Sequence, residues 1–431
     1  MKRDLFQEMR AWKVAPSRKP LLIRGARQVG KSWLVRKLGE SFENFVEINF
    51  EENREIETFF AGNLEPEALL FHLSNYLGVS ITPGKTLLFF DEIQTCPRAL
   101  LALRYFYEKM PDLHVTAAGS LIEFDLQHLS FPVGRLQCLY LHPLSFGEFL
   151  QAIGRGAMRE LLRQQREVPE PIHRQLMEHV RDYSIIGGLP EVVQCFVTSK
   201  NIPRCQEIQT GILETYRSDF GKYARRSQIK YVRLLFDSLC LQLGKKFQYA
   251  HVSQDVRSRE LSQALDLLEM AGIVHKVYHS NANAMPLEAE INRKKFKVLF
   301  FDLGLANRIA GFEIKDLFKD PDISAVHKGR LAELFVGLEL AAYTSPLERP
   351  RLHYWHREEP ASNAEVDYVI VKEAEIVPIE VKSGTGGRLT SLRRFLSEKN
   401  KPLGIRIGSN PYAEEEMLRF VPFYAIESLK T

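Results

Sequence analysis

The run from Gly25 to Ser32 reads Gly-Ala-Arg-Gln-Val-Gly-Lys-Ser, and its residue types and spacing suit it to holding phosphate groups. Every fixed position of the pattern G-x-x-x-x-G-K-[ST] is filled. The glycines let backbone N–H groups turn toward phosphate oxygens, while Lys31 can reach the β- and γ-phosphates and Ser32 can ligate Mg²⁺. The sequence therefore predicts a site for a nucleoside triphosphate and Mg²⁺, built from Gly25, Ala26, Arg27, Gln28, Val29, Gly30, Lys31, Ser32 and Trp33.

The residues on either side of this run fit a phosphate-binding loop. The apolar segment from Leu21 to Ile23 reads as a strand, and the segment from Trp33 to Leu38 reads as a helix. A strand before the loop and a helix after it are the context that the motif requires. The alternative, a chance match in a glycine-containing turn, leaves both flanks unexplained.

Two carboxylates follow a second apolar strand. Leu87 to Phe90 read as a fully buried parallel strand, and Asp91 and Glu92 come directly after it. Ligands of open α/β sheets bind at the carboxyl ends of the strands. We expect Asp91 to hold the water shell of Mg²⁺ and Glu92 to orient the attacking water, so that both join Lys31 in the catalytic set.

Ser120 and Arg135 are further candidates for this site. Ser120 follows a third predicted strand, Val115 to Ala118, and would lie beside the strand that carries Asp91. It can sense the γ-phosphate or the lytic water, and a simple turn serine fits it equally well. Arg135 is the candidate cation for transition-state charge, acting on its own chain or on a neighbouring subunit. Its alternative is an ordinary surface arginine.

The runs GARQVGKS, LLFFDEIQ, AGSL and PLSFGEF together resemble the AAA-type ATPases of bacteria and archaea that carry a DUF4143-type C-terminal region. The resemblance covers almost the whole chain. It implies ATP as the nucleotide and a core close to the STAND and archaeal-ATPase branch of P-loop proteins. It also implies that a Gly-x-Pro turn at the end of a helical lid contacts the adenine, a role that falls on Leu189 and Pro190. The same residues fit a turn that ends a helix.

The middle of the chain has the element order of a winged helix. Residues 228–243 and 257–270 have apolar positions at helical spacing, and residues 273–278 and 296–301 read as the two strands of a hairpin. Helices followed by a hairpin match the winged-helix plan. The plan serves either DNA contact or a regulatory lid that packs on the ATPase core.

Basic residues cluster around these elements and favour contact with DNA phosphates. Two of them, Arg257 and Arg259, begin the helix that would read the DNA. The full set is Arg225, Arg226, Lys245, Lys246, Arg257, Arg259, Arg293, Lys294, Lys295 and Lys297.

A nuclease-like set of residues lies in the C-terminal third. Glu380 and Lys382 point to one face of a predicted strand, and Asp367 lies on the preceding strand where it can pair with Glu380. Two convergent carboxylates can hold Mg²⁺, and the lysine can position a water for phosphodiester attack. The spacing D-x(12)-E-x-K resembles the PD-(D/E)xK nuclease fold, in which Glu333 matches an extra acidic residue on a preceding helix. Val366 stands where the pattern has proline.

This resemblance leaves three interpretations open. The segment can be an active nuclease, a nuclease fold that recognises DNA or protein without cutting, or a half-exposed hairpin with an incidental salt bridge. The residue types alone do not choose among them.

Length and composition limit the remaining classes. The chain has 431 residues, enough for two to four domains, and a net charge of +4, so nucleic-acid contact must come from local patches. Its five scattered cysteines indicate reduced thiols, and no apolar run approaches the roughly 18 residues of a membrane span. We expect a cytoplasmic protein without a membrane partner. The oligomeric state stays open, although action of Arg135 on a neighbour would require a homo-oligomer.

These observations predict an α/β protein in four parts. They are a parallel-sheet P-loop NTPase core of the AAA type at 1–155, a helical lid at 156–222, a winged helix at 223–312 and a PD-(D/E)xK-like α/β domain at 325–431. The leading hypothesis is an ATP-hydrolysing enzyme whose nucleotide state controls a DNA-facing module, with ATP and duplex or branched DNA as partners. The alternative is a slow STAND-like nucleotide switch that binds protein partners and has no nuclease activity.

Overall fold

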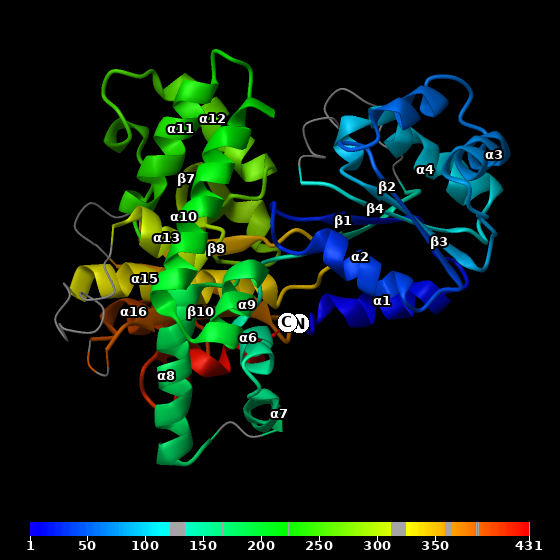
Figure 1. The fold of residues 1–431 in the computed structure, drawn as a ribbon. Coiled ribbons are helices and arrows are strands. Elements are labelled where there is room, and N and C mark those ends of the chain that lie inside the picture. Colours follow the sequence, from blue (N-terminus) through cyan, green and yellow to red (C-terminus); the bar gives the residue numbers. More distant parts are fainter. Residues whose placement is uncertain are drawn as a thin grey trace.

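The computed structural model describes residues 1–120, 134–164, 167–222, 224–311, 325–357, 364–384, 386 and 388–430, and it places them in two parts (Figure 1). One part, coloured from blue to cyan, holds a five-stranded sheet between helices. The other part, mainly green to red, holds an eight-stranded sheet with helices stacked around it. The two chain ends lie together where the parts meet.

The N-terminal part alternates strands and helices, as expected of an α/β fold with a parallel sheet. Its elements are α1 (Leu5–Val14), β1 (Leu21–Arg24), α2 (Lys31–Gly39), β2 (Asn44–Asn49), η1 (Arg54–Phe60), α3 (Pro66–Leu77), β3 (Thr86–Asp91), η2 (Ile93–Thr95), α4 (Pro97–Lys109), β4 (His114–Ala118) and β5 (Gln137–Tyr140).

The first sheet has the order β2-β3-β4-β1-β5, and its neighbouring strands are parallel. Side chains along each strand alternate between two faces, and both faces are covered. Leu21 and Ile23 pack in the core that includes α1 and α2, whereas Leu22 packs in the core that includes α3 and α4. Burial on both faces explains why the strands read as continuous apolar runs in the sequence. The predicted parallel α/β core is confirmed.

A helical region and a hairpin follow. The helices are α6 (Phe146–Ala152), α7 (Gly156–Gln164), α8 (Glu170–Ile186), α9 (Pro190–Ser199), α10 (Ile202–Asp219), η3 (Phe220–Lys222), α11 (Ile229–Ser238), η4 (Leu239–Gln242), η5 (Tyr249–His251) and α12 (Ser258–Met270). The hairpin and its neighbours are β6 (Val274–Ser280), η6 (Leu287–Glu290), β7 (Ile291–Phe300) and α13 (Leu303–Ile309).

The C-terminal region completes the second sheet. Its elements are α15 (Ala325–Ala342), β8 (Leu352–His356), β9 (Glu365–Lys372), β10 (Glu375–Lys382), α16 (Thr390–Lys399), β11 (Gly404–Gly408), β12 (Ala413–Glu415), β13 (Leu418–Pro422) and η7 (Phe423–Leu429). The sheet order is β12-β13-β11-β10-β9-β8-β6-β7.

This order changes the expected division of the chain. The two strands of the predicted winged helix, β6 and β7, pair with each other, and β6 also pairs with β8 in parallel. The hairpin is therefore the edge of the C-terminal sheet, so the expected regions 223–312 and 325–431 share one sheet. Local sequence patterns do not indicate this pairing, because β6 and β8 are far apart along the chain.

A buried arginine joins the two ends of the chain. The Arg159 side chain is 1% exposed, and it donates to Asp4 near the N-terminus and to Glu427 in η7. Its Nη1 lies 2.9 Å from Asp4 Oδ1 and its Nε lies 2.8 Å from Glu427 Oε2. The N-terminal segment is thereby fixed against both α7 and η7.

None of the helices in the described part of the chain is both long enough and apolar enough to pass through a bilayer.

A buried carboxyl group joins α15 to α6. Glu339 Oε1 accepts a 2.9 Å hydrogen bond from the backbone N–H of Phe146, the first residue of α6. Burial raises the pKa of Glu339 to about 8, against the lowering effect of its hydrogen bonds from Phe146 and Tyr343. The carboxyl group is therefore largely protonated at neutral pH.

This protonation predicts a pH dependence of stability. The pKa of Glu339 in the folded chain lies above its unfolded value, so folding loses stability as pH rises from about 4.5 to about 8. Glu339→Gln keeps a neutral acceptor and should lose less melting temperature across that window than the wild type. Thermal unfolding at pH 5, 6.5 and 8 checks this, with Glu416→Gln as an exposed control. Parallel curves for wild type and Glu339→Gln would contradict it.

Candidate functional site

The predicted phosphate-binding loop lies between β1 and α2. Gly25 and Gly30 have φ values of 148° and 96°, and Gln28 has a φ of 63°. A Cβ atom at Gly25 would collide with the carbonyl oxygen of Leu141. Glycine is therefore required at the start of the loop by backbone conformation and by space together.

Lys31 is folded into this loop. Its ammonium group donates to the carbonyl oxygens of Gly25 at 3.0 Å and Ala26 at 2.8 Å, and the residue is buried. Burial lowers the pKa of Lys31 to about 8, while Glu92 and Asp91 act to raise it. The two carbonyl oxygens thus accept hydrogen bonds from the Lys31 ammonium group. This group lies at the first turn of α2, where a phosphate can be bound.

Ser32 and Asp91 meet across the edge of the sheet. Ser32 Oγ, on the first turn of α2, donates a 2.8 Å hydrogen bond to Asp91 Oδ2 at the end of β3. Burial raises the pKa of Asp91, although the Ser32 hydrogen bond lowers it. A hydroxyl and a desolvated carboxylate side by side are oxygen ligands of the kind that Mg²⁺ takes, so these residues fit the ion.

Glu92 and Ser120 lie at the same edge. Glu92 follows β3 with a left-handed φ of 49°, and its carboxylate accepts from Gln94 Nε2. Ser120 follows β4, the strand between β1 and β3, and its Oγ accepts from Arg27 Nε at 3.3 Å. The structure therefore brings together Lys31, Ser32, Asp91, Glu92 and Ser120 at the carboxyl ends of the strands of the first sheet.

Trp33 lies one residue beyond Ser32 on α2, and its side chain is 44% exposed.

Arg27 ties the loop to the helical region. Besides Ser120, its guanidinium group pairs with Asp219 at the end of α10 and with Glu51 at 3.2 Å. Lys222 also lies 3.1 Å from Glu51. The loop conformation is thus coupled by charge to α10 and η3.

The predicted Gly-x-Pro turn lies against the loop. Pro190 begins α9, and a Cβ atom placed on Gly30 would lie 3.5 Å from its ring. Leu189 is almost fully buried in the core. Contact of either residue with adenine stays a prediction, and its geometry favours Pro190 over Leu189.

The nuclease-like residues also come together, around a lysine. Lys297 Nζ lies 2.7 Å from Glu333 Oε1, 2.6 Å from Glu365 Oε1 and 3.7 Å from Asp367 Oδ1. Asp367 Oδ2 accepts from the backbone N–H of Val381 at 2.8 Å.

On the neighbouring strand, Lys382 Nζ donates to Glu380 Oε1 at 2.6 Å. Within the described ranges, no group of three or more His, Cys, Asp or Glu side chains is arranged to hold a metal ion. The expected Mg²⁺ set of Glu333, Asp367 and Glu380 therefore does not fit the ion in this structure.

Comparison with known families divides the chain into three segments. Residues 17–150 match the model of an AAA domain. Residues 177–316 match a domain of unknown function, DUF8612, and residues 328–426 match another, DUF4143. The first segment is similar to AAA domains and is called the AAA domain below. The DUF8612 match spans the expected boundary between the lid and the winged helix.

Solved structures give weaker similarities. A Walker-type ATPase of Pyrococcus abyssi is 17% identical, with 71% of this chain and 95% of that chain covered and a TM-score of 0.46. The ORC1 protein of Aeropyrum pernix, solved in complex with DNA, is 12% identical, with 72% and 93% covered and a TM-score of 0.29. PCH-2 of C. elegans is 12% identical, with 47% and 63% covered and a TM-score of 0.27. The comparison with curated proteins found no match.

Arg135 is not where its predicted role on the same chain requires it. It precedes β5, so it lies at the edge of the AAA sheet opposite the loop, and its Nε pairs with Glu108 Oε1 at 2.9 Å near the end of α4. Parallel strands start at one edge and end at the other, and the loop follows a strand whereas Arg135 precedes one. Arg135 therefore does not reach the loop of its own chain.

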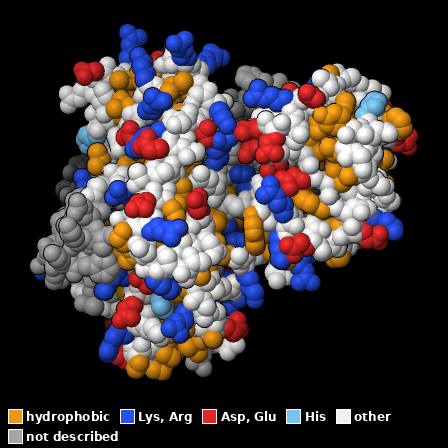
Figure 2. Space-filling view, in the orientation of Figure 1, with side chains coloured by type: hydrophobic (Ala, Val, Ile, Leu, Met, Phe, Trp, Pro, Cys, Tyr) orange, Lys and Arg blue, Asp and Glu red, His pale blue; other side chains and the backbone are white. Residues whose placement is uncertain are grey.

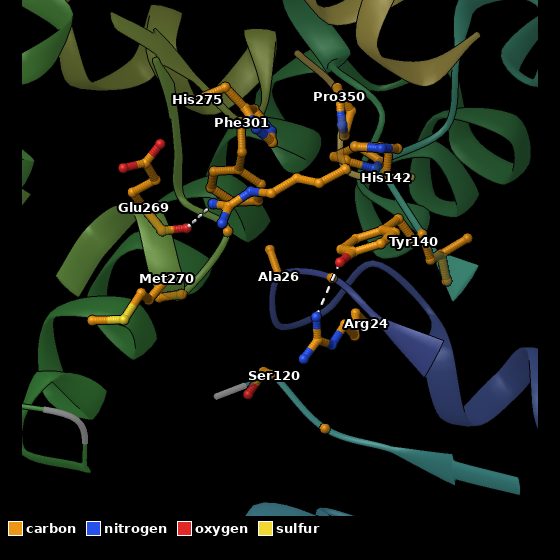
Figure 3. A pocket seen from close by; sticks show the side chains of 17 residues that line it. Arg24, Ala26, Ser120, Tyr140, His142, Glu269, Met270, His275, Phe301 and Pro350 are labelled. Atoms are coloured by element: carbon orange, nitrogen blue, oxygen red, sulfur yellow. Dashed lines mark hydrogen bonds between the residues drawn. The ribbon is translucent and has the colours of Figure 1, made fainter. Parts of the chain in front are cut away.

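The AAA domain meets the α12–β6 turn at a pocket (Figure 3). Figure 3 shows Arg24 donating a hydrogen bond to the Tyr140 hydroxyl on one side of the pocket. On the other side, Arg349 donates to the backbone carbonyl oxygen of Glu269 at 2.9 Å. A Cβ atom on Gly272 would lie 3.2 Å from the backbone nitrogen of Ala26. The turn after α12 is thus in contact with the start of the phosphate loop.

Two histidines line the pocket with their rings 5.8 Å apart. Burial lowers the pKa of His142 to about 4 and that of His275 to about 3, and the positive charge of Arg3 acts in the same direction on His142. Both imidazoles are therefore neutral at physiological pH. They add no positive charge to the pocket beside the loop.

Two residues that support the loop were not predicted. Arg3 donates to the carbonyl oxygens of Val29 at 2.8 Å and His142 at 2.6 Å. Asp302 accepts from the backbone N–H groups of Gly188 at 2.8 Å and Leu305 at 2.9 Å. Asp302 precedes a helical segment, and aspartate is a common helix cap, so its contact with Leu305 could have been predicted from the sequence. Its contact with Gly188 could not, because Gly188 is distant in the sequence.

We expect Asp302→Ala to weaken both folding and nucleotide binding. The change leaves two buried N–H donors unpaired, which should cost about 1–3 kcal/mol of unfolding free energy. The turn at Leu189 and Pro190 then loses its anchor beside Gly30. Urea unfolding and titration with a fluorescent ATP analogue measure the two effects, with exposed Asp255→Ala as control. Wild-type affinity in a folded Asp302→Ala protein would contradict the anchoring role.

Proposed function

We propose that the AAA domain binds ATP with Mg²⁺ and hydrolyses it, and that the nucleotide state is passed to the helical region and the hairpin. The observation that carries the proposal is the 2.8 Å hydrogen bond between Ser32 and Asp91 beside Lys31. It joins the loop to the carboxylate strand, so that two oxygen groups of the kind that Mg²⁺ takes as ligands lie side by side. Ser32 and Asp91 would hold Mg²⁺, whose chemistry would be to neutralise charge on the β- and γ-phosphates.

The other residues have roles that follow from their positions. Lys31 exchanges its two loop carbonyls for phosphate oxygens, which are charged and therefore stronger acceptors. Glu92, at the end of β3, orients the attacking water and accepts its proton. Ser120, beside β3, contacts the γ-phosphate or that water. Pro190 lies near enough to the loop to contact the base.

Arg27 is the proposed cation on the same chain, in the role expected of Arg135. It belongs to the loop, and its guanidinium group already reaches Ser120. A γ-phosphate would compete with Glu51 and Asp219 for this guanidinium group. Release of Asp219 would then free the end of α10, which is how the nucleotide state would reach the helical region. A role for Arg135 requires a second copy of the chain.

Contact with DNA is the second proposal, and the exposed basic surface favours it. Figure 2 shows Lys and Arg side chains gathered at the end of the molecule where α11 and α12 lie. The exposed members of the predicted cluster are Arg225, Arg226, Lys245, Arg257, Arg259, Arg293 and Lys294. Lys297, which the sequence placed in this cluster, is instead buried. Stimulation of phosphate release by duplex, single-stranded or branched DNA tests the proposal. A variant with both Arg257→Glu and Arg259→Glu should lose this stimulation.

Substitutions at Lys31 and Glu92 separate hydrolysis from binding. Lys31→Ala should abolish ATP binding and turnover, whereas Glu92→Gln should bind ATP and lose about 10²–10⁴-fold in turnover. Phosphate release and titration with a fluorescent ATP analogue measure the two quantities. Lys37→Ala, on the exposed face of the same helix, is the matched control. Tight binding with negligible wild-type turnover would instead support the slow nucleotide switch with a protein partner.

Arg27 and Asp219 can be tested as a pair. Arg27→Ala should lower turnover by about 10²-fold or more, because a cation at the transferred phosphate is lost. Asp219→Asn breaks the same ion pair but leaves Arg27 available, so it should retain turnover. Phosphate release at saturating ATP is the measurement. Equal losses in the two variants would mean that the ion pair only supports the fold.

A further inference from the structure

A buried ammonium group fills the carboxylate cluster of the C-terminal region. Lys297 comes from β7 and its side chain is 2% exposed. It lies 2.7 Å from Glu333 on α15 and 2.6 Å from Glu365 on β9, with Asp367 on β9 at 3.7 Å. Three segments that are distant in sequence therefore meet at one nitrogen.

The surroundings of this nitrogen keep it charged. Burial alone would lower the pKa of Lys297, but Glu333, Asp367 and Glu365 raise it well above its ordinary value. The ring of Tyr354 on β8 adds a further favourable contact, with Nζ 5.2 Å from the ring centre. A buried charge is tolerated when it is paired and hydrogen-bonded in this way.

We propose that Lys297 is a resident cation that takes the place of a divalent metal ion in this cluster, so that the cluster joins β7 to α15 and β9 and does not cleave nucleic acid. The ammonium group uses the oxygens of Glu333 and Asp367 that a metal ion would need. A divalent ion beside it would place two further positive charges in the same buried space. The inference does not depend on ATP hydrolysis.

The other half of the expected site agrees with this assignment. Lys382, which was expected to position a water, lies 2.6 Å from Glu380 Oε1. Glu380 is only 6% exposed. Its second oxygen, Glu380 Oε2, has no hydrogen-bond partner among the described residues, whereas Glu333 and Glu365 both form ion pairs with Lys297. Removal of Lys297 would leave Glu333, Asp367 and Glu380 able to take a metal ion.

A Mn²⁺ titration of the full chain tests the inference. Asp91→Asn is included in every protein, so that the nucleotide site contributes no metal binding. With Lys297 present we expect no saturable binding of Mn²⁺ by electron paramagnetic resonance, and with Lys297→Met about one equivalent bound per chain. Adding Asp367→Asn to Lys297→Met should remove that binding again. Mn²⁺ should also raise the melting temperature of Lys297→Met and not that of its parent.

Two results would overturn the inference. One is Mn²⁺ binding, or Mn²⁺-dependent cleavage of supercoiled DNA, by the chain with Lys297 that is lost in Asp367→Asn. The other is a folded Lys297→Met protein, shown by circular dichroism, that gains no Mn²⁺. Lys297→Gln serves as a second variant if Lys297→Met does not fold. If neither folds, the measurement on the chain with Lys297 decides, because absence of Asp367-dependent binding and cleavage supports the assignment.

Discussion

The parallel register of the first sheet is the constraint on which the AAA site depends. Ala117 of β4 is aligned with Leu22 of β1 on one side and with Phe90 of β3 on the other. The three strands therefore end at the same level, and the segments after them meet at one edge. This register brings Ser32 to Asp91 and places Ser120 beside them. It also explains Arg135, because a residue before a parallel strand belongs to the opposite edge.

The loop is also held by segments from the rest of the chain. Arg3 binds one of its carbonyls, and Tyr216 donates to another, that of Arg27, at 2.8 Å. Pro190 and Gly272 pack against Gly30 and Ala26. The loop therefore has contacts with the N-terminus, the helical region and the hairpin at once. A change in the conformation of the loop on binding a phosphate would therefore alter its contacts with the N-terminus, the helical region and the hairpin.

The features of the fold and the site that could be predicted from the sequence are those that residues close together in the chain determine. The loop and Asp91 were predictable because a motif and an apolar strand fix them within a few residues. The buried position of Lys297 was not predictable, because in the sequence it ends a basic run that reads as exposed. Its side chain is buried only because β7 pairs with β6, which aligns Lys297 with Val277. The shared sheet was missed for the same reason, since β6 meets β8 across a long separation in the chain. Propensity and periodicity carry no information on such pairings.

The position of Arg159 has a consequence for how the protein is made. Asp4 and Arg159 leave the ribosome before Glu427, which lies 268 residues beyond Arg159 along the chain. Until then a guanidinium group that is buried in the finished protein has half of its partners missing. Arg3, the neighbour of Asp4, holds the phosphate loop. The ion-pair network that fixes the segment next to Arg3 is therefore complete only after Glu427 has been synthesised.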